Sequence, residues 1–230
     1  MATRPHTDRE YEGELLRLRE QVILMGAEVE GMIADSIRSL VERDSALARA
    51  VMDRDARVDQ IEVQNDALCL SLLARRQPVA SDLRFITTVL KIVRDLERAG
   101  DQAVNIAERV IELNEEPPLK AYVDIPRMAQ GVQAMLRDAL DALVNGDDVG
   151  AQNLIHRDDQ IDALYDRVNR VLLTYMMENP QNIFRATRLQ SIGHNLERIS
   201  DHATNIAEMV VFYVKGTDIR HGGVGDHPGR

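Results

Sequence analysis

Residues 95–108 read DLERAGDQAVNIAE, and residues 195–208 read NLERISDHATNIAE. The two copies share Leu, Glu, Arg, Asp, Ala, Asn, Ile, Ala and Glu in register, which indicates an internal repeat. Residues four apart lie on the same face of a helix, so each copy predicts an oxygen-rich stripe on one helix face. The stripes comprise Glu97, Asp101 and Asn105 in the first copy and Glu197, Asp201 and Asn205 in the second.

Apolar residues recur at spacings of three and four on both sides of these copies, a pattern typical of helices. Prolines and turn residues divide the pattern into six segments. No segment alternates apolar and polar residues with a period of two between hairpin turns, so no sheet is expected. The predicted helices cover residues 8–41, 44–76, 81–113, 126–145, 148–177 and 180–215. The sequence therefore predicts an all-α fold of two tandem, pseudo-repeated antiparallel three-helix bundles.

The strongest break between the copies is the stretch NEEPP at residues 114–118, which has two prolines and no apolar periodicity. Such a composition is typical of a connector. We therefore expect a first bundle, a linker, a second bundle and a mobile C-terminal tail. Their predicted bounds are 1–114, 115–124, 125–216 and 217–230.

Charge and composition narrow the class of protein. The formal net charge is −10 and neither half has a run of Lys and Arg, which disfavours binding to nucleic acid. The single cysteine, Cys69, excludes an intrachain disulfide framework and fits a reducing cytoplasm as a buried apolar residue. The N-terminus has no apolar signal-peptide core, and no apolar run approaches the roughly 20 residues that span a bilayer. We expect a soluble cytoplasmic protein.

A second acidic pattern accompanies the first. Asp55 and Asp59 lie four apart in the second predicted helix, and Asp158 and Asp162 lie four apart in the fifth, each pair directly after an arginine. The offset between these pairs is 103 residues. Each bundle therefore has one carboxylate pair on its second helix and another on its third. The candidate metal ligands are Asp55, Asp59, Glu97, Asp101, Asp158, Asp162, Glu197 and Asp201.

Carboxylates that face one another on antiparallel helices repel unless a cation or an arginine lies between them. The pattern thus predicts either an oxygen-ligand metal site or an ion-pair network with Arg94, Arg98 or Arg198, and a solvated acidic face is the third reading. All-oxygen ligands suit Mg²⁺, Ca²⁺, Mn²⁺ or ferric iron better than a thiolate-seeking ion. His194 stands where the first copy has Arg94, and we expect an ordinary hydrogen-bonded histidine there, with metal binding and an ion pair with the carboxylates as the alternatives.

No catalytic constellation accompanies the carboxylates. Di-iron enzymes of helix bundles need Glu-x-x-His motifs, and no histidine of this chain has Glu three positions before it. There is no Ser/His/Asp arrangement, phosphate-cradling Gly-rich loop or zinc spacing. We therefore expect no catalytic and no cofactor-binding residues, and no enzyme.

Several motifs together resemble one known family. They are RQPVASDLR at residues 76–84, Lys91, the two copies of the repeat, and the stretch VKGTDIRH at residues 214–221. These residues closely resemble the PhoU family of phosphate-signalling regulators, over nearly the whole chain. Ser200 in place of Gly100, and Asn195 in place of Asp95, are departures between the copies that remove no candidate ligand.

The resemblance implies a cytoplasmic, non-enzymatic adaptor that represses the phosphate-starvation response when phosphate is plentiful. The implied partners are the ATPase subunit of the phosphate ABC transporter and the phosphate-sensing histidine kinase, with membrane contact only through them, and a homodimer is implied. Family members carry Glu/Asp-x-x-x-Asp pairs that can hold multinuclear metal clusters, and the eight candidate ligands match those pairs. Iron, manganese, magnesium and zinc are the candidate ions. The alternative function is a metal-carboxylate protein for metal storage or redox chemistry.

Overall fold

The computed structural model describes residues 9–119 and 124–219. Within these ranges the chain is helical and contains no strand, as predicted. The elements are α1 (Arg9–Glu42), α2 (Ser45–Asp53), α3 (Asp55–Arg76), α4 (Ala80–Asn114), α5 (Asp124–Asn145), α6 (Asp148–Ile155), α7 (Asp158–Glu178), the short 3-10 helix η1 (Pro180–Asn182) and α8 (Ile183–Lys215).

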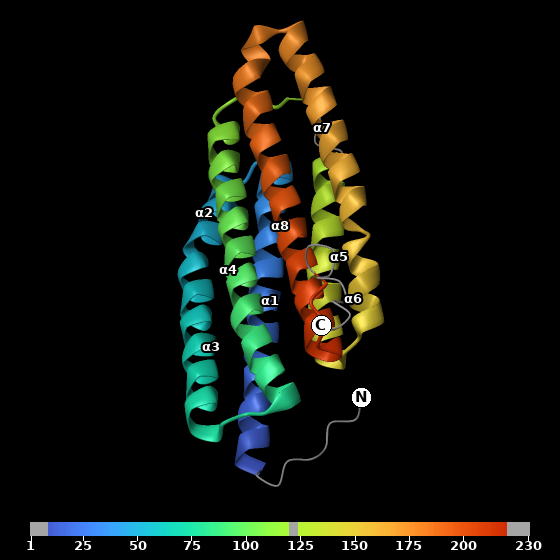
Figure 1. The fold of residues 1–230 in the computed structure, drawn as a ribbon. Coiled ribbons are helices and arrows are strands. Elements are labelled where there is room, and N and C mark those ends of the chain that lie inside the picture. Colours follow the sequence, from blue (N-terminus) through green and yellow to red (C-terminus); the bar gives the residue numbers. More distant parts are fainter. Residues whose placement is uncertain (1–8, 120–123, 220–230) are drawn as a thin grey trace.

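The helices run lengthwise in one elongated molecule (Figure 1). In the N-terminal half α1 and α3 pack against α4, and in the C-terminal half α5 and α7 pack against α8. The most extensive contact between any two helices joins α4 to α8, and α1 also packs on α5. The two bundles therefore lie side by side, with the α3–α4 turn and the α7–α8 turn at opposite ends (Figure 1). The predicted pair of tandem bundles is confirmed.

Polar contacts cross the interface between α4 and α8. Asp95 Oδ1 accepts a hydrogen bond from the Asn205 amide at 3.2 Å and lies 2.9 Å from His202 Nδ1. Asn195, the residue that replaces Asp95 in the second copy, is buried. Of these two equivalent positions, only the one on α4 carries a carboxylate. That carboxylate, on Asp95, lies where α8 offers two polar partners.

Aliphatic side chains fill the core of both halves. Leu18, Met25, Leu96 and Met128 are fully buried, in keeping with a chain that has only 3% aromatic residues. Cys69 is also fully buried, and burial raises the pKa of its thiol to about 12. Its sulfur is therefore protonated at neutral pH and packs as a small apolar group, as predicted.

Two of the predicted helices are broken. The segment predicted as one helix over residues 44–76 forms α2 and α3, and the segment predicted over residues 148–177 forms α6 and α7. The breaks lie at Arg54 and at residues 156–157. Neither break contains Gly or Pro, and Arg54 keeps right-handed helical angles (φ −77°), so periodicity continues through the bend. This continuity is why the sequence pattern did not reveal the breaks.

A tightened turn forms each break. The Arg54 N–H donates to the Val51 carbonyl at 3.1 Å, and the Arg157 N–H donates to the Leu154 carbonyl at 2.8 Å. Both bonds reach back three residues instead of four, as in a 3-10 turn. The two halves therefore bend their second helical segment in the same way.

The arginine at each break is tethered to the first helix of its half. The Arg54 guanidinium lies 2.6 Å from Glu28 and 3.0 Å from Asp35 on α1, and Arg157 pairs with Asp138 on α5. Gly31 lies beside this tether, where a Cβ would come within 2.7 Å of Arg54 Nη2 and would displace the guanidinium. Charge-assisted hydrogen bonds therefore fix the bend.

The turn between α1 and α2 in the first half is repeated between α5 and α6 in the second half. Arg43 and Gly146 both adopt left-handed angles, with φ of 57° and 62°. Asp44 and Asp147 follow them and cap the next helix through their side chains. Arg43 is not a glycine, but its guanidinium donates to the carbonyls of Leu113, Asn114 and Glu116 at the end of α4.

Parts of the predicted connecting segments fall outside the described residues. The predicted linker, 115–124, includes residues 120–123, and the predicted tail, 217–230, lies mostly within 220–230, neither of which the structure describes. None of the helices described here, in residues 9–119 and 124–219, combines the length and the apolar composition of a membrane-spanning segment.

Replacing Arg54 with alanine should lower the free energy of unfolding by about 1–3 kcal/mol, because Glu28 and Asp35 would keep partly buried charges without a guanidinium. Urea unfolding followed by circular dichroism measures this difference. Arg57→Ala is the matched control. The Arg57 side chain is exposed, and its guanidinium lies farther from Glu28, at 3.5 Å. Arg57→Ala should cost less than about 0.5 kcal/mol. Equal losses in the two variants would contradict a special role for the tether.

Candidate functional site

The N-terminal half brings its four predicted ligands together between α3 and α4. Asp55 is repelled by both Asp59 and Asp101, and Glu97 is repelled by Asp101 and Asp59, so the two pairs face each other. Glu62, one turn beyond Asp59 on α3, joins them. Asp59, Glu62 and Glu97 each place one carboxylate oxygen within 4.8 Å of the other two.

Electrostatics make this cluster costly when it is fully ionised. Burial raises the pKa of Glu97 above its ordinary value, and repulsion from Asp101 adds to that rise. Burial likewise raises the pKa of Asp55, with Asp59 and Asp101 adding to it. For Glu62 burial again is the main cause, followed by repulsion from Asp66. The cluster therefore favours either a bound proton or a bound cation.

Arg98 supplies part of the missing positive charge. Its guanidinium lies 3.0 Å from Asp101 and 3.4 Å from Glu97, both on the same helix. Half of the Arg98 side chain is exposed to solvent, so water screens these pairs. The predicted ion pair with Arg98 thus forms on the α4 side of the cluster, and repulsion still raises the pKa of Glu97.

The C-terminal half repeats the arrangement between α7 and α8. Burial raises the pKa of Asp158, and repulsion from Asp201 and Asp162 raises it further, while the nearby Ser200 hydroxyl works against the rise. Burial also raises the pKa of Asp201, with Glu197 and Asp162 as the repelling neighbours. The four predicted ligands of this half therefore also form one cluster.

Ser200 and His194 are the two substitutions near this second cluster. Ser200 is fully buried, and its hydroxyl donates a hydrogen bond to the Glu197 carbonyl at 2.7 Å. The buried hydroxyl is therefore satisfied within α8. His194 Nδ1 lies 3.2 Å from Glu197 Oε2, an ion-pair distance if the ring is protonated. The structure thus gives His194 a carboxylate partner within its own helix.

Glu62 is a cluster residue that the sequence reasoning missed. At the offset of 103 residues Glu62 corresponds to Tyr165, so the internal repeat does not mark it. A signal was present in the N-terminal half alone, because Asp59, Glu62 and Asp66 follow one another at three and four residues along one face of α3. The halves therefore differ, with an extra carboxylate in the first and an aromatic ring in the second.

The chemical type of the coordinating atoms decides which ions suit the cluster. Three converging carboxylate oxygens without sulfur are typical of sites for hard cations such as Mg²⁺, Ca²⁺, Mn²⁺ or ferric iron. The raised pKa of Glu62 and Glu97 fits this reading, because a cation would relieve the repulsion. Among the described residues, Asp59, Glu62 and Glu97 form the group whose ligand atoms converge this closely.

The fold and the clusters together define an all-helical protein of two repeated bundles, each with an acidic seam between its second and third helical segments. The sequence profile of the PhoU domain matches residues 22–110 and again residues 125–210. The chain therefore belongs to the PhoU family, which confirms the resemblance found in its motifs.

Relatives and solved structures agree with this assignment. A phosphate-specific transport system accessory protein PhoU homolog of Pseudomonas putida is 42% identical over 95% of this chain and 86% of the relative. The crystal structure of PhoU from Pseudomonas aeruginosa has a TM-score of 0.87 and 41% identity, covering 90% of this chain and 100% of that one. The phosphate transport system regulatory protein PhoU from Streptococcus pneumoniae has a TM-score of 0.85 and 27% identity, covering 91% and 99%.

Glu97→Gln should raise the stability of the metal-free protein at pH 7 by on the order of 0.5 kcal/mol, because it removes one of several like charges. The folded-state pKa of Glu97 is raised, so its ionised form opposes folding at neutral pH. This penalty disappears as the pH falls below the ordinary value of 4.5, and the gain should disappear with it.

Urea unfolding at pH 7 and at pH 4 in the presence of a chelator tests this dependence. Glu20→Gln, on the exposed surface of α1, is the control and should change the stability at pH 7 by less than Glu97→Gln does. A Glu97→Gln variant that is less stable than the wild type at pH 7 would show that the ion pair with Arg98 outweighs the repulsion.

Proposed function

We propose that this protein regulates phosphate uptake as a cytoplasmic adaptor that represses the phosphate-starvation response when phosphate is plentiful. The observation that carries the proposal is the PhoU domain match in both halves, at residues 22–110 and 125–210. Relatives that are about 40% identical over more than 90% of this chain are named accessory proteins of the phosphate-specific transport system. The chain is long enough and similar enough for the same role.

The physical character of the fold supports an adaptor without catalytic activity. Long helices such as α4, of 35 residues, and α8, of 33 residues, offer extended rigid faces for other proteins. The names of the relatives describe accessory and regulatory proteins, which supports a role through binding. The carboxylate clusters can hold a cation or a proton, and neither use requires turnover of a substrate.

The partners that we propose are the ATPase subunit of the phosphate ABC transporter and the phosphate-sensing histidine kinase. Contact with the membrane would then occur only through these proteins. We also propose a homodimer, and two folding units over residues 1–114 and 125–216 with linker 115–124 and tail 217–230. Separate matches of the PhoU domain within each unit support that division.

Deleting the gene should switch on phosphate-starvation genes in high phosphate, because the repressing adaptor would be absent. A starvation-promoter reporter measures the response, and expression of the intact chain should restore repression. Affinity purification of the chain from cells in high and low phosphate should recover the transporter ATPase or the sensor kinase in a phosphate-dependent way. A reporter that remains repressed in the deletion strain would refute the proposal.

We propose that the eight carboxylates of the two clusters hold metal ions, with iron, manganese, magnesium and zinc as candidates. The convergence of Asp59, Glu62 and Glu97 supports this for the N-terminal half. A bound cation would join α3 to α4 across the seam by neutralising carboxylates from both helices. In that role the metal would stabilise the arrangement of the bundle.

A second candidate function is storage or redox chemistry of the bound metal. The presence of two clusters in one chain favours it, because paired carboxylate sites raise the number of ions held per molecule. This candidate and the adaptor are separable, since metal binding and repression can be measured on the same variants.

Elemental analysis of protein purified without added metal should find bound metal in the wild type. Asp101→Ala and Asp201→Ala should each lose the share held in one half, because each removes a ligand that faces the second helical segment. If metal is lost and repression of the reporter continues, metal binding and regulation are separate functions. A wild-type protein without metal, even after incubation with each candidate ion, would eliminate the storage function and the metal sites.

A further inference from the structure

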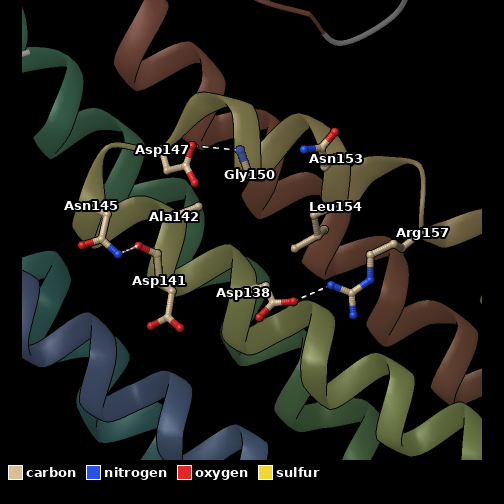
Figure 2. A pocket seen from close by; sticks show the side chains of 9 residues that line it. All are labelled: Asp138, Asp141, Ala142, Asn145, Asp147, Gly150, Asn153, Leu154 and Arg157. Atoms are coloured by element: carbon tan, nitrogen blue, oxygen red, sulfur yellow. Dashed lines mark hydrogen bonds and ion pairs between the residues drawn. The ribbon is translucent and has the colours of Figure 1, made fainter.

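A pocket lined mostly by polar residues lies in the C-terminal half, where α5 ends and α6 begins (Figure 2). Its volume is about 270 Å³, enough for the end of a large side chain. None of the residues that line it is one of the eight candidate metal ligands. Its lining consists of Asp138, Asp141, Ala142, Asn145, Asp147, Gly150, Asn153, Leu154 and Arg157.

Two of its three carboxylates already have partners. Asp138 pairs with Arg157 across the pocket, and Asp147 caps α6 by accepting the Gly150 N–H at 2.9 Å (Figure 2). The third carboxylate, on Asp141, has no hydrogen bond or ion pair within the described part of the chain. Only its backbone carbonyl is engaged, by the Asn145 amide at 2.9 Å. Of the three carboxylates only Asp138 therefore has a cationic partner, and Asp141 is the one with neither a cation nor a hydrogen-bond donor in the described part of the chain.

The internal repeat shows what occupies the corresponding place in the N-terminal half. At the offset of 103 residues, Asp138, Asp147 and Arg157 correspond to identical residue types. Asp141 instead corresponds to Arg38. The Arg38 guanidinium lies 2.9 Å from Asp35, the counterpart of Asp138. In the first half, the chain thus supplies a second guanidinium to this aspartate from its own sequence.

The C-terminal half lacks that guanidinium and leaves space around its position. Asp141 puts a carboxylate one helical turn from Asp138, and like charges at this spacing destabilise a helix. Gly150 corresponds to Leu47 of the first half, so a side chain that is present there is missing here. A position that holds a cation in one repeat is therefore an acidic hollow in the other.

We propose that this pocket receives the guanidinium of an arginine from a partner protein. The proposal rests on the proposed adaptor function, and it assigns the adaptor a docking point. The incoming arginine would pair with Asp141 and share Asp138, as Arg38 pairs with Asp35 in the first half. Arginine fits better than a metal ion because its planar, weakly hydrated head can pair with carboxylates beside another guanidinium. Asp147 is already used as a helix cap, and Arg157 would repel a compact divalent charge.

The test is a titration of the intact ¹⁵N-labelled protein with Nα-acetyl-L-arginine methylamide, followed by NMR. The expected result is a saturable shift of the Gly150 and Asn153 amide signals. The citrulline analogue has the same shape without the charge, and it should bind at least tenfold more weakly. Asp141→Arg should weaken arginine binding at least tenfold, because it restores the built-in guanidinium of the first half.

Glu178→Arg is the matched control, because it makes the same charge reversal at an exposed position at the far end of α7. It should leave arginine binding unchanged, and the remaining signals of Asp141→Arg should confirm that the variant folds. Equal binding of arginine and citrulline would overturn the proposal. Shifts of the same amides by Mg²⁺ or Mn²⁺ without any by arginine would also overturn it, in favour of a metal site. Because the probe is a small molecule, failure here leaves the starvation-reporter result unaffected.

Discussion

The tether between a bend arginine and the first helix is the interaction on which each half depends. Arg54 is held by Glu28 and Asp35, and the next residue, Asp55, begins α3. The tether thus fixes the direction in which α3 leaves the bend. That direction brings its aspartates against Glu97 and Asp101 on α4. The favourable ion pairs of Arg54 with α1 therefore hold α3 in a position where its aspartates repel the carboxylates of α4.

Periodicity and repetition predicted most of the fold and the grouping of the eight carboxylates, because both depend on helical spacing alone. The breaks in the second and fifth predicted helices were missed because the backbone at Arg54 stays in the helical region and no Gly or Pro marks it. Their cause is a tertiary contact, which no local pattern contains. Glu62 was missed for a different reason, since its counterpart Tyr165 is not acidic and comparison of the repeats passed over it.

The two halves share a scaffold and differ in charge at a few positions. The bend arginines, the left-handed turn and the capping aspartates are repeated. Glu62 against Tyr165 changes the acidic seam, and Arg38 against Asp141 changes the outer face of the first helix of each half. The bend arginines and the capping aspartates are thus kept, while the left-handed turn residue changes from Arg43 to Gly146 and the acidic and outer positions vary, so the two halves share one backbone path with different charges.

The α3–α4 turn and the α7–α8 turn define the two ends of the molecule (Figure 1). α4 has 35 residues, which at 1.5 Å per residue gives a rod of roughly 50 Å. α4 and α8 pack side by side, and the α3–α4 turn and the α7–α8 turn lie at opposite ends of the molecule (Figure 1). The two turns are therefore separated along the long axis of the molecule, and a protein bound at one turn would not contact a small protein bound at the other.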